Sequence, residues 1–294
     1  MGADLNDLYQ RVGDRLNLLR QKRIEHEEIL AFYAKVLAAQ QEAQRETKVP
    51  DVHLREDHLT VKVEEGFPLV DRESFPVDEN CTLGLFQTIC RLAMEENPVL
   101  AGAGETLLEA AVSGALDISQ LITATLNNDS TVFEVRANDL GINLPILQAL
   151  TKLSLQPSLF AAAEAMAQRV ALSDWRHGYC PICGALPAIA GLVGEEGKRT
   201  ALCSFCGHSW QLPRLSCPFC DNTEQEQLRY FYGEGDDLYR VQVCDQCGSY
   251  LKVVDTREGG DVEVLAVDDV ATAHLDLLAE QAGYQRRAPR LWGI

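Results

Sequence analysis

Eight of the ten cysteines of this chain lie between residues 180 and 247, in four pairs that each enclose two residues. The pairs are Cys180/Cys183, Cys203/Cys206, Cys217/Cys220 and Cys244/Cys247. A Cys-x-x-Cys turn directs both thiolates at one metal ion, and a tetrahedral four-thiolate site needs two such turns. The sequence therefore predicts two metal sites. Pairing of neighbouring turns is favoured, because interleaved pairing would require the short segments between the turns to braid.

The residues that follow the cysteine pairs suit such turns. Gly184, Gly207 and Gly248 come directly after three of the pairs. Glycine adopts a positive φ without steric cost, which lets backbone amides point at the sulfur atoms. Asp221 and Asn222 follow the remaining pair, and these are the next most tolerant residue types for that conformation. The alternative use of so many cysteines is a disulfide framework, which seldom consists of repeated Cys-x-x-Cys pairs.

Four thiolates close a tetrahedral site and leave no coordination position for a water nucleophile. Neither predicted centre is therefore suited to hydrolysis. Thiolate ligands suit Zn(II) and equally suit iron in the manner of rubredoxin, so the ligand set does not distinguish the two metals. Zinc would have a structural role, whereas iron would provide a one-electron couple. Metal binding is expected to contribute on the order of 10 kcal/mol to the folding of such small modules.

The chain is strongly acidic, with a formal net charge of −18. From Gly178 onward it contains 10 Lys and Arg against 17 Asp and Glu. Binding to nucleic acid requires clustered basic residues that neutralise phosphates, so this balance argues against a nucleic-acid partner. The N-terminus lacks an export-signal pattern, and no apolar run approaches the roughly 20 residues of a membrane span. Together with reduced thiols, these features indicate a cytoplasmic protein without membrane insertion.

Apolar residues recur at helical spacing through most of the first half of the chain, for example at Leu5, Leu8, Val12, Leu16 and Leu19. Further helices are expected near Cys81, over 105–116, over 117–126 with Asp117 as the N-cap, and over 158–175. Residues 131–135 fit either a strand or a helix. Residues 50–77, with their prolines, are expected to form a long and partly extended connection.

After Gly178 the pattern changes to short β-rich runs, at 188–193, 199–203, 228–232, 239–243, 251–254 and 262–267. Asp268 and Asp269 are expected to cap a last helix. We therefore predict an α+β protein. Its domains would be a mostly helical domain (1–177), a first rubredoxin-like or zinc-ribbon four-cysteine module (178–215), and a second such module with a C-terminal helix and tail (216–294).

Several other residues invite a functional interpretation, but a structural one is favoured. His177 and His208 lie near cysteine pairs, where four thiolates are already available to each site. Cys90 falls on an apolar helix face and reads as a small buried hydrophobe, and Cys81 is assigned no chemistry. No Gly-rich phosphate loop, G-x-S-x-G or H-E-x-x-H motif occurs. The tail (residues 284–292) is basic and apolar, and we expect it to pack on the ribbons, with partner binding as the alternative.

The combination of these motifs resembles a known family. CPICG opens the cysteine region, CPFCDN forms its third turn, Asp-Asp-Val-Ala-Thr-Ala-His-Leu-Asp begins at Asp268, and Gly-Tyr-Gln-Arg precedes a closing Leu-Trp-Gly. This order, after a helical region, is similar to that of the FdhE family of bacterial formate dehydrogenase accessory proteins, over essentially the whole chain. Asp221 departs from the glycine found in the other three turns.

The resemblance implies a cytoplasmic assembly factor or chaperone and not an enzyme. Such a protein would bind the catalytic subunit of a respiratory formate dehydrogenase during maturation, before export by the twin-arginine route. The resemblance also favours iron over zinc, held by Cys180, Cys183, Cys203, Cys206, Cys217, Cys220, Cys244 and Cys247. A rubredoxin-like one-electron carrier and a nucleic-acid-binding zinc ribbon are the alternatives, and self-association is left open.

Overall fold

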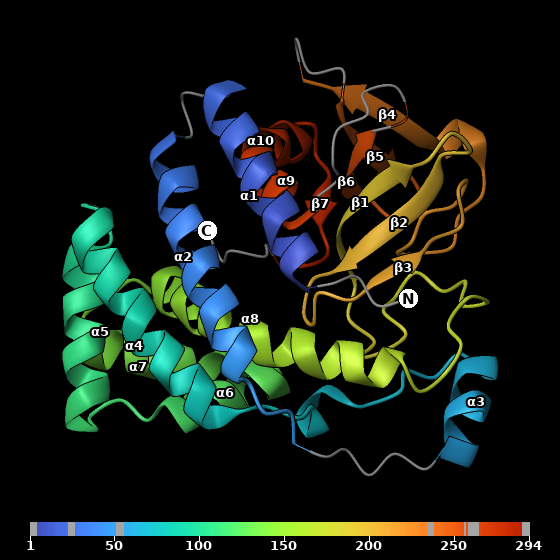
Figure 1. The fold of residues 1–294 in the computed structure, drawn as a ribbon. Coiled ribbons are helices and arrows are strands. Elements are labelled where there is room, and N and C mark those ends of the chain that lie inside the picture. The colour runs from blue at the N-terminus through green and yellow to red at the C-terminus, as the bar shows by residue number, and fades with distance from the viewer. Residues whose placement is uncertain are drawn as a thin grey trace. The chain divides into compact units, whose positions relative to one another are not determined.

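The computed structural model describes residues 5–22, 27–50, 56–233, 238–255, 257 and 265–289 (Figure 1). The chain divides into two compact units. Unit 1 comprises Met1–Lys22, Arg55–Leu69 and Met166–Leu291, and unit 2 comprises Arg23–Leu54, Val70–Ala165 and Trp292–Ile294. The architecture is α+β as predicted, with a helical N-terminal region and a sheet in the C-terminal part. The division into three domains at residues 177 and 215 stays a prediction.

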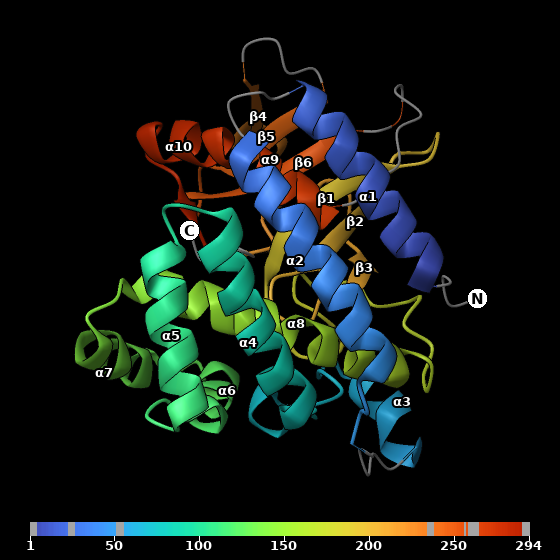
Figure 2. The same ribbon diagram turned by 60° about the vertical axis from the view of Figure 1, so that its left-hand side comes forward.

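Unit 2 is helical. Its elements are α2 (Glu27–Glu46), η2 (Arg72–Ser74), α4 (Glu79–Glu96), α5 (Ala101–Ser113), α6 (Ile118–Asn127), α7 (Ser130–Leu140) and all but the end of α8 (Leu144–Ala167). Helices α4 and α5 pack side by side (Figure 2), and α2 and α6 also contact α4. The core consists of the apolar stripes of these helices and includes Phe86, Ile89 and Cys90, which are fully buried. Cys90 is therefore the buried hydrophobe that the sequence indicates.

Aspartates begin three of these helices. Asp78 accepts from the N–H of Cys81, Asp117 from that of Ser119, and Asp129 from that of Thr131. Each carboxylate satisfies a backbone donor that the first turn of a helix leaves free. The Asp117 cap is as predicted. Residues 131–135, which fit either structure in the sequence, are helical because the Asp129 cap begins α7 directly before them.

Unit 1 is built on a sheet. Its strands are β1 (Pro187–Val193), β2 (Lys198–Cys203), β3 (Ser209–Gln211), β4 (Leu228–Tyr232), β5 (Tyr239–Cys244), β6 (Ser249–Asp255) and β7 (Gln285–Arg286). The strand order is β3-β2-β1-β6-β5-β4, and β7 pairs with β6. Neighbours pair antiparallel except β1 with β6 and β6 with β7, which are parallel. One sheet thus joins both pairs of cysteine turns, through the contact between β1 and β6.

Helices cover this sheet. Helix α9 (Leu265–Ala271) packs on β1 and β6, α10 (Ala273–Gln281) packs on β5, β6 and β7, and α1 (Leu5–Lys22) packs on α9 (Figure 1). Lys252 of β6 reaches Asp269 of α9, so Val254, two residues further along the strand, lies on the same face and is buried. The prediction of a strand over 262–267 is wrong for residues 265–267, because Leu265–Val267 form the first turn of α9. Residues 262–264 lie outside the described residues.

The connection expected over residues 50–77 contains a helix, α3 (Glu56–Glu64), which the sequence reading missed. Lys62, near its end, donates to the carbonyls of Pro68 and Leu69, which folds the following segment back. Among the described residues no single helix is long and apolar enough to cross a membrane; the bent pair α5 and α6, with 110° between its helices, passes that test by length and composition alone.

Candidate metal centre

The eight cysteines form two clusters, each made by neighbouring turns in the sequence. Their sulfur atoms lie within 4.8 Å of one another in each cluster, which consist of Cys180, Cys183, Cys203 and Cys206, and of Cys217, Cys220, Cys244 and Cys247. This is the sequential grouping that the sequence favoured. The first cluster lies at the ends of β1 and β2, and the second at the ends of β5 and β6.

Backbone turns hold the sulfur atoms in place. Residues 184, 207, 221 and 248, which follow the pairs, have φ of 72°, 74°, 55° and 64°. In three of the turns this residue donates its N–H to the carbonyl of the first cysteine, over 2.9 to 3.0 Å. Asp221 therefore adopts the same left-handed conformation as the three glycines, and its departure from glycine does not change the turn.

The sulfur separations match a tetrahedral metal site. In the first cluster Cys183 Sγ lies 3.5 Å from Cys203 Sγ and 3.6 Å from Cys206 Sγ. In the second, Cys217 Sγ and Cys247 Sγ are 3.7 Å apart. A tetrahedron with metal–sulfur bonds of about 2.3 Å has edges of about 3.8 Å. A disulfide would bring two sulfurs to about 2.05 Å, and all ten cysteines are free thiols.

Burial and hydrogen bonding act on the thiols in opposite directions. Burial opposes ionisation of Cys203, but hydrogen bonds from neighbouring thiols and from the N–H of Phe205 lower its pKa well below its usual value. In the second cluster burial likewise opposes ionisation of Cys244, but the N–H of Cys247 and the amide of Asn222 help to lower its pKa to about 7. Each cluster thus contains one cysteine, Cys203 or Cys244, whose thiolate form is favoured.

Three other thiols, those of Cys180, Cys206 and Cys217, resist ionisation. Burial is the main cause that raises the pKa of Cys180 and of Cys206, and it also raises that of Cys217. Four adjacent thiolates therefore need a cation between them to offset their burial and mutual repulsion. The donor set, the spacing and the turn geometry all fit a metal ion with four thiolate ligands.

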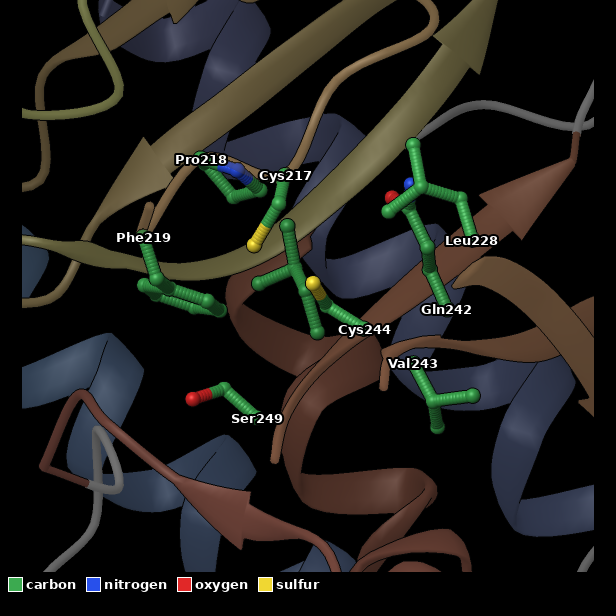
Figure 3. Close-up of a pocket in the computed structure, with 9 residues that line it drawn as sticks. Cys217, Pro218, Phe219, Leu228, Gln242, Val243, Cys244 and Ser249 are labelled. Atoms are coloured by element: carbon green, nitrogen blue, oxygen red, sulfur yellow. The ribbon is translucent and has the colours of Figure 1, made fainter. Parts of the chain in front are cut away.

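The two clusters differ in exposure. All four cysteines of the first cluster are buried, whereas Cys220 and Cys247 of the second are partly exposed. A cavity of about 10 Å³ adjoins Cys217 and Cys244 of the second cluster and is lined mainly by apolar groups (Figure 3). Such a volume holds at most a single water molecule. This cavity is therefore not a substrate pocket.

An aromatic group supports the first cluster. His177 stacks on Tyr179 with 5.1 Å between ring centroids, and Trp175 meets both rings edge-on. The Tyr179 hydroxyl donates to the carbonyl of Gly66 over 2.7 Å. The group thereby fixes the segment after α3 beside the first turn. His177 serves packing, as expected, and His208 is likewise outside the described four-cysteine group.

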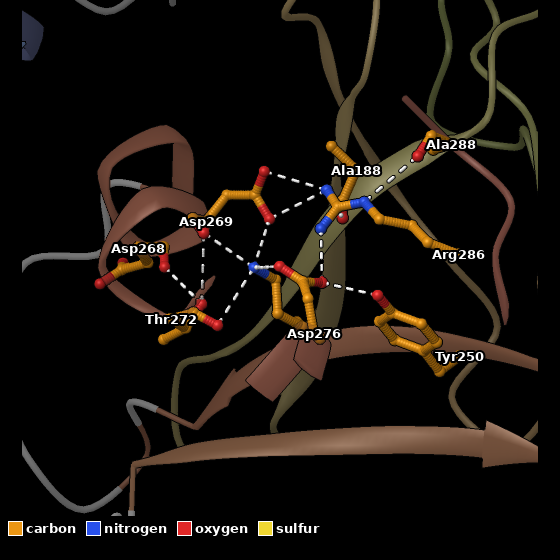
Figure 4. Close-up of polar contacts among 9 residues, drawn as sticks. Ala188, Tyr250, Asp268, Asp269, Thr272, Asp276, Arg286 and Ala288 are labelled. Carbon is orange, nitrogen blue, oxygen red and sulfur yellow. Dashed lines mark hydrogen bonds and ion pairs between the residues drawn. The ribbon is translucent and has the colours of Figure 1, made fainter. Parts of the chain in front are cut away.

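A buried ion cluster, which the sequence does not reveal, joins β6 and β7 to α9 and α10 (Figure 4). Lys252 on β6 contacts Asp269 and Asp276, each at 2.8 Å. Arg286 on β7 contacts the same two carboxylates at 3.0 and 2.8 Å. Tyr250 donates to Asp276 over 2.8 Å. Two positive and two negative side chains thus compensate one another in the interior.

This cluster corrects the interpretation of Asp268 and Asp269 as helix caps. Both lie inside α9 and are buried, at 0% and 4% exposure. Arg15 of α1 binds Asp268 at 2.8 Å, and Tyr239 also donates to that carboxylate. An N-cap precedes the first helical residue, whereas these carboxylates lie within α9 and tie it to α1 and the sheet. No local pattern marks them, because their partners lie far away in the sequence.

The described part of the tail packs against the second cysteine cluster, as the sequence predicts. The N–H of Gln285 donates to the carbonyl of Gly248 over 2.8 Å. The Tyr284 hydroxyl donates to Asp245 over 2.6 Å, and Arg287 donates to the carbonyl of Cys247 over 3.3 Å. Residues 290–292 lie outside the described residues. The tail therefore helps to hold the turn between Cys244 and Gly248.

Comparison of the sequence with known proteins points to the same family as the motifs of the cysteine region and the tail. Residues 215–292 match the model of the FdhE C-terminal domain. The chain is 26% identical to an FdhE homologue of Aquifex aeolicus over 96% of each chain. It is 28% identical to the FdhE protein of Shigella boydii serotype 18, over 96% of this chain and 86% of that protein.

The fold has a counterpart in the crystal structure of the FdhE protein from Pseudomonas aeruginosa. The TM-score is 0.72 at 23% identity, and the match covers 99% of this chain and 97% of that one. This likeness concerns the fold, with its helical region and its sheet. With a matching C-terminal domain model and relatives along almost the whole chain, the chain is similar to the FdhE proteins, which is the resemblance that its motifs indicate.

Proposed function

We propose that the protein is an accessory factor for formate dehydrogenase and is not itself an enzyme. The observation that carries this proposal is the likeness to FdhE proteins over 96% of the chain, because the resemblance implies that role. The site geometry supports it. Each cysteine cluster provides four thiolates, which fill a tetrahedral site and leave no position for a water nucleophile.

We further propose that each cluster holds one metal ion. The family resemblance favours iron, and zinc is the alternative that the same thiolates would accept. The role of the ions would be to fix the turns at the strand ends, since binding energy at such sites is folding energy. Metal analysis of the purified chain tests this: two equivalents are expected, and none in a natively folded chain would contradict it.

The partner that we propose is the catalytic subunit of a respiratory formate dehydrogenase, bound in the cytoplasm during maturation and before twin-arginine export. The cysteine turns are the proposed contact surface. Phe67 and Leu215, 61% and 60% exposed, lie beside them: Phe67 precedes Pro68, which packs on Gly184, and Leu215 shortly precedes Cys217. The described tail residues use many of their polar groups within the chain, so they contribute less to this proposal.

A deletion strain and a tagged full-length chain test the role. We expect low formate dehydrogenase activity in the deletion strain, restored by the wild-type gene, and recovery of the catalytic subunit with the tagged protein. A Phe67→Ser/Leu215→Ser variant should lose the subunit but keep its metal content, and Val112→Ser, at an exposed site of unit 2, is the matched control. Unchanged activity in the deletion strain, with no subunit recovered, would refute the accessory role.

One observation favours a second candidate function, one-electron transfer. Cys220 and Cys247 are partly exposed, and electron exchange with a partner requires a centre near the surface. With iron bound, a reversible change in visible absorption on reduction would support this candidate. Absence of that change in an iron-loaded chain would leave the accessory role alone.

A further inference from the structure

A buried arginine connects the two halves of the sheet beside the second cluster. Arg199 lies on β2 and is 1% exposed. Its guanidinium donates to the carbonyl of Ser216 over 2.9 Å and to that of Pro213 over 3.3 Å. It also donates to the side-chain oxygen of Gln242 on β5. Since β1 and β6 separate β2 from β5 in the strand order, the sheet curls enough for this contact.

Among the residues that the structure describes, Arg199 has no carboxylate partner, unlike the other buried cations of unit 1. Arg15, Lys252 and Arg286 each contact an aspartate within 3.0 Å. The contacts of Arg199 within the described part of the chain are carbonyl and amide oxygens, and its Nε has no hydrogen-bond partner there. An arginine remains charged when buried, and a buried charge without a counter-ion is costly. Its counter-charge should therefore be nearby.

The second cysteine cluster is in the right place to supply that charge. Ser216 directly precedes Cys217, and Gln242 lines the same small cavity as Cys217 and Cys244 (Figure 3). The guanidinium of Arg199 thus donates to the residue next to one cysteine of this cluster, Cys217. Four thiolates around a divalent ion carry an excess of two negative charges, and around a trivalent ion an excess of one. In its described contacts the first cluster involves no Lys or Arg side chain.

We propose that Arg199 is the internal counter-charge of the second four-cysteine centre and that it selectively strengthens metal retention there. This inference rests on the metal-holding role proposed above. Arg199 acts through the segment that precedes Cys217 and through Gln242, so it positions and compensates the centre without being a ligand. Groups around a metal site that orient its ligands typically change metal affinity by about 10- to 100-fold when they are removed.

The test uses the full-length chain loaded with Zn(II). A chelator is added, cysteines are alkylated in timed pulses, and mass spectrometry reports which cluster becomes reactive. Arg199→Met removes the charge and keeps much of the side-chain length. It should speed alkylation of Cys217 and Cys244 by about 10-fold or more, with less than about 3-fold change at Cys180 and Cys203. Arg199→Lys keeps the charge but loses the planar fork of donors, so it should speed alkylation of the second cluster less than Arg199→Met does.

Two controls separate charge compensation from general destabilisation. Arg15→Met removes a buried arginine that has its own partner, Asp268, and should affect both clusters equally. Arg287→Met removes an exposed arginine that donates to the carbonyl of Cys247, and solvent screening should make its effect small. Equal acceleration at both clusters by Arg199→Met, or no acceleration at the second, would overturn the inference.

The remaining outcomes are also decisive. If Arg199→Met does not fold, Arg199→Gln replaces it as a neutral variant that can still donate to Ser216. If neither neutral variant folds, the folded Lys variant decides the question. Selective acceleration of alkylation at its second cluster by about 10-fold or more would refute the inference, because the charge is still present, and a smaller change would support it. If the wild-type second cluster holds no zinc and is alkylated without chelator, the metal-site proposal itself fails for that cluster, and this inference fails with it.

Discussion

Replacing Arg286 with methionine tests the buried ion cluster that joins β6 and β7 to α9 and α10. The Arg286 side chain is 9% exposed and contacts Asp269 at 3.0 Å and Asp276 at 2.8 Å. It also donates to the carbonyl of Ala188 over 3.1 Å. Without it Lys252 is the cation of this cluster that remains to balance the two carboxylates. The variant therefore leaves one buried negative charge uncompensated.

The expected loss follows from this uncompensated charge. Removing one partner of a buried ion pair typically costs about 3–5 kcal/mol. Because Lys252 stays within 2.8 Å of both carboxylates, we expect a value near the lower limit, about 3 kcal/mol. With an m-value of about 2 kcal/mol/M, the urea midpoint of the β-sheet transition should fall by about 1.5 M.

The variant should also be more sensitive to acid. Burial opposes ionisation of Asp269, but Lys252 and Arg286 lower its pKa below the usual value. A depressed pKa contributes stability above the unfolded-state pKa of about 3.9, and this stability is lost as the pH falls through the folded-state pKa. Without Arg286 the depression is smaller, so acid unfolding should begin at a higher pH than in wild type.

Urea titrations of the metal-loaded chain, followed by circular dichroism, measure this effect. The neighbouring Arg287 is exposed, so Arg287→Met is the matched control and should cost less than about 1 kcal/mol. The midpoint pH of acid unfolding of Arg287→Met should match that of wild type. This comparison separates the contribution of the ion cluster from the loss of metal that follows protonation of the thiolates. If Arg286→Met and Arg287→Met have the same urea midpoint, the cluster does not stabilise the fold as argued.

Three further predictions follow from the site. Cys180→Ser/Cys183→Ser should lose one metal equivalent and keep the other by elemental analysis; loss of both would mean that the sites depend on each other. A chelator should empty the second cluster first, because Cys220 and Cys247 are partly exposed, and reversal of this order in timed alkylation would contradict the role of exposure. Gly178→Ala should cost about 3 kcal/mol in urea, because its Cβ would lie 1.9 Å from the carbonyl oxygen of Pro218, whereas Gly102→Ala, with open space around it, should cost nothing.

Local chemistry explains what the sequence could predict. The grouping of the cysteines follows from their spacing, and the left-handed residues at 184, 207, 221 and 248 follow from the turn that this spacing requires. Strands β1, β2, β4, β5 and β6 agree with the expected β-rich runs within a few residues. Asp117 begins α6 as predicted. In all these cases the determining interactions lie within a few residues of one another.

Long-range partners explain what the sequence could not predict. Asp268 resembles a cap because it precedes an apolar stripe, yet its partner Arg15 is 253 residues away. Arg199 and its neighbour Lys198 look alike as a basic pair, but they alternate on β2, so that Lys198 is exposed and Arg199 is buried. Only the pairing of β2 with its neighbouring strands, which decides which face of β2 points toward the core, distinguishes the two residues. Helix α3 was missed because prolines nearby suggested an extended chain.

The motifs that identify the family also explain why its C-terminal part folds as it does. Asp269, Asp276 and Arg286 belong to the Asp-Asp-Val-Ala-Thr-Ala-His-Leu-Asp and Gly-Tyr-x-Arg segments, and in space they form one ion cluster with Lys252. The same segment places Gln285 on the turn of the second cysteine cluster. These specific residues of the resemblance are therefore buried or support the second cysteine cluster, and do not form an exposed contact surface. Substitutions on the exposed turns should change partner binding without unfolding the chain, whereas substitutions in the ion cluster should lower stability first.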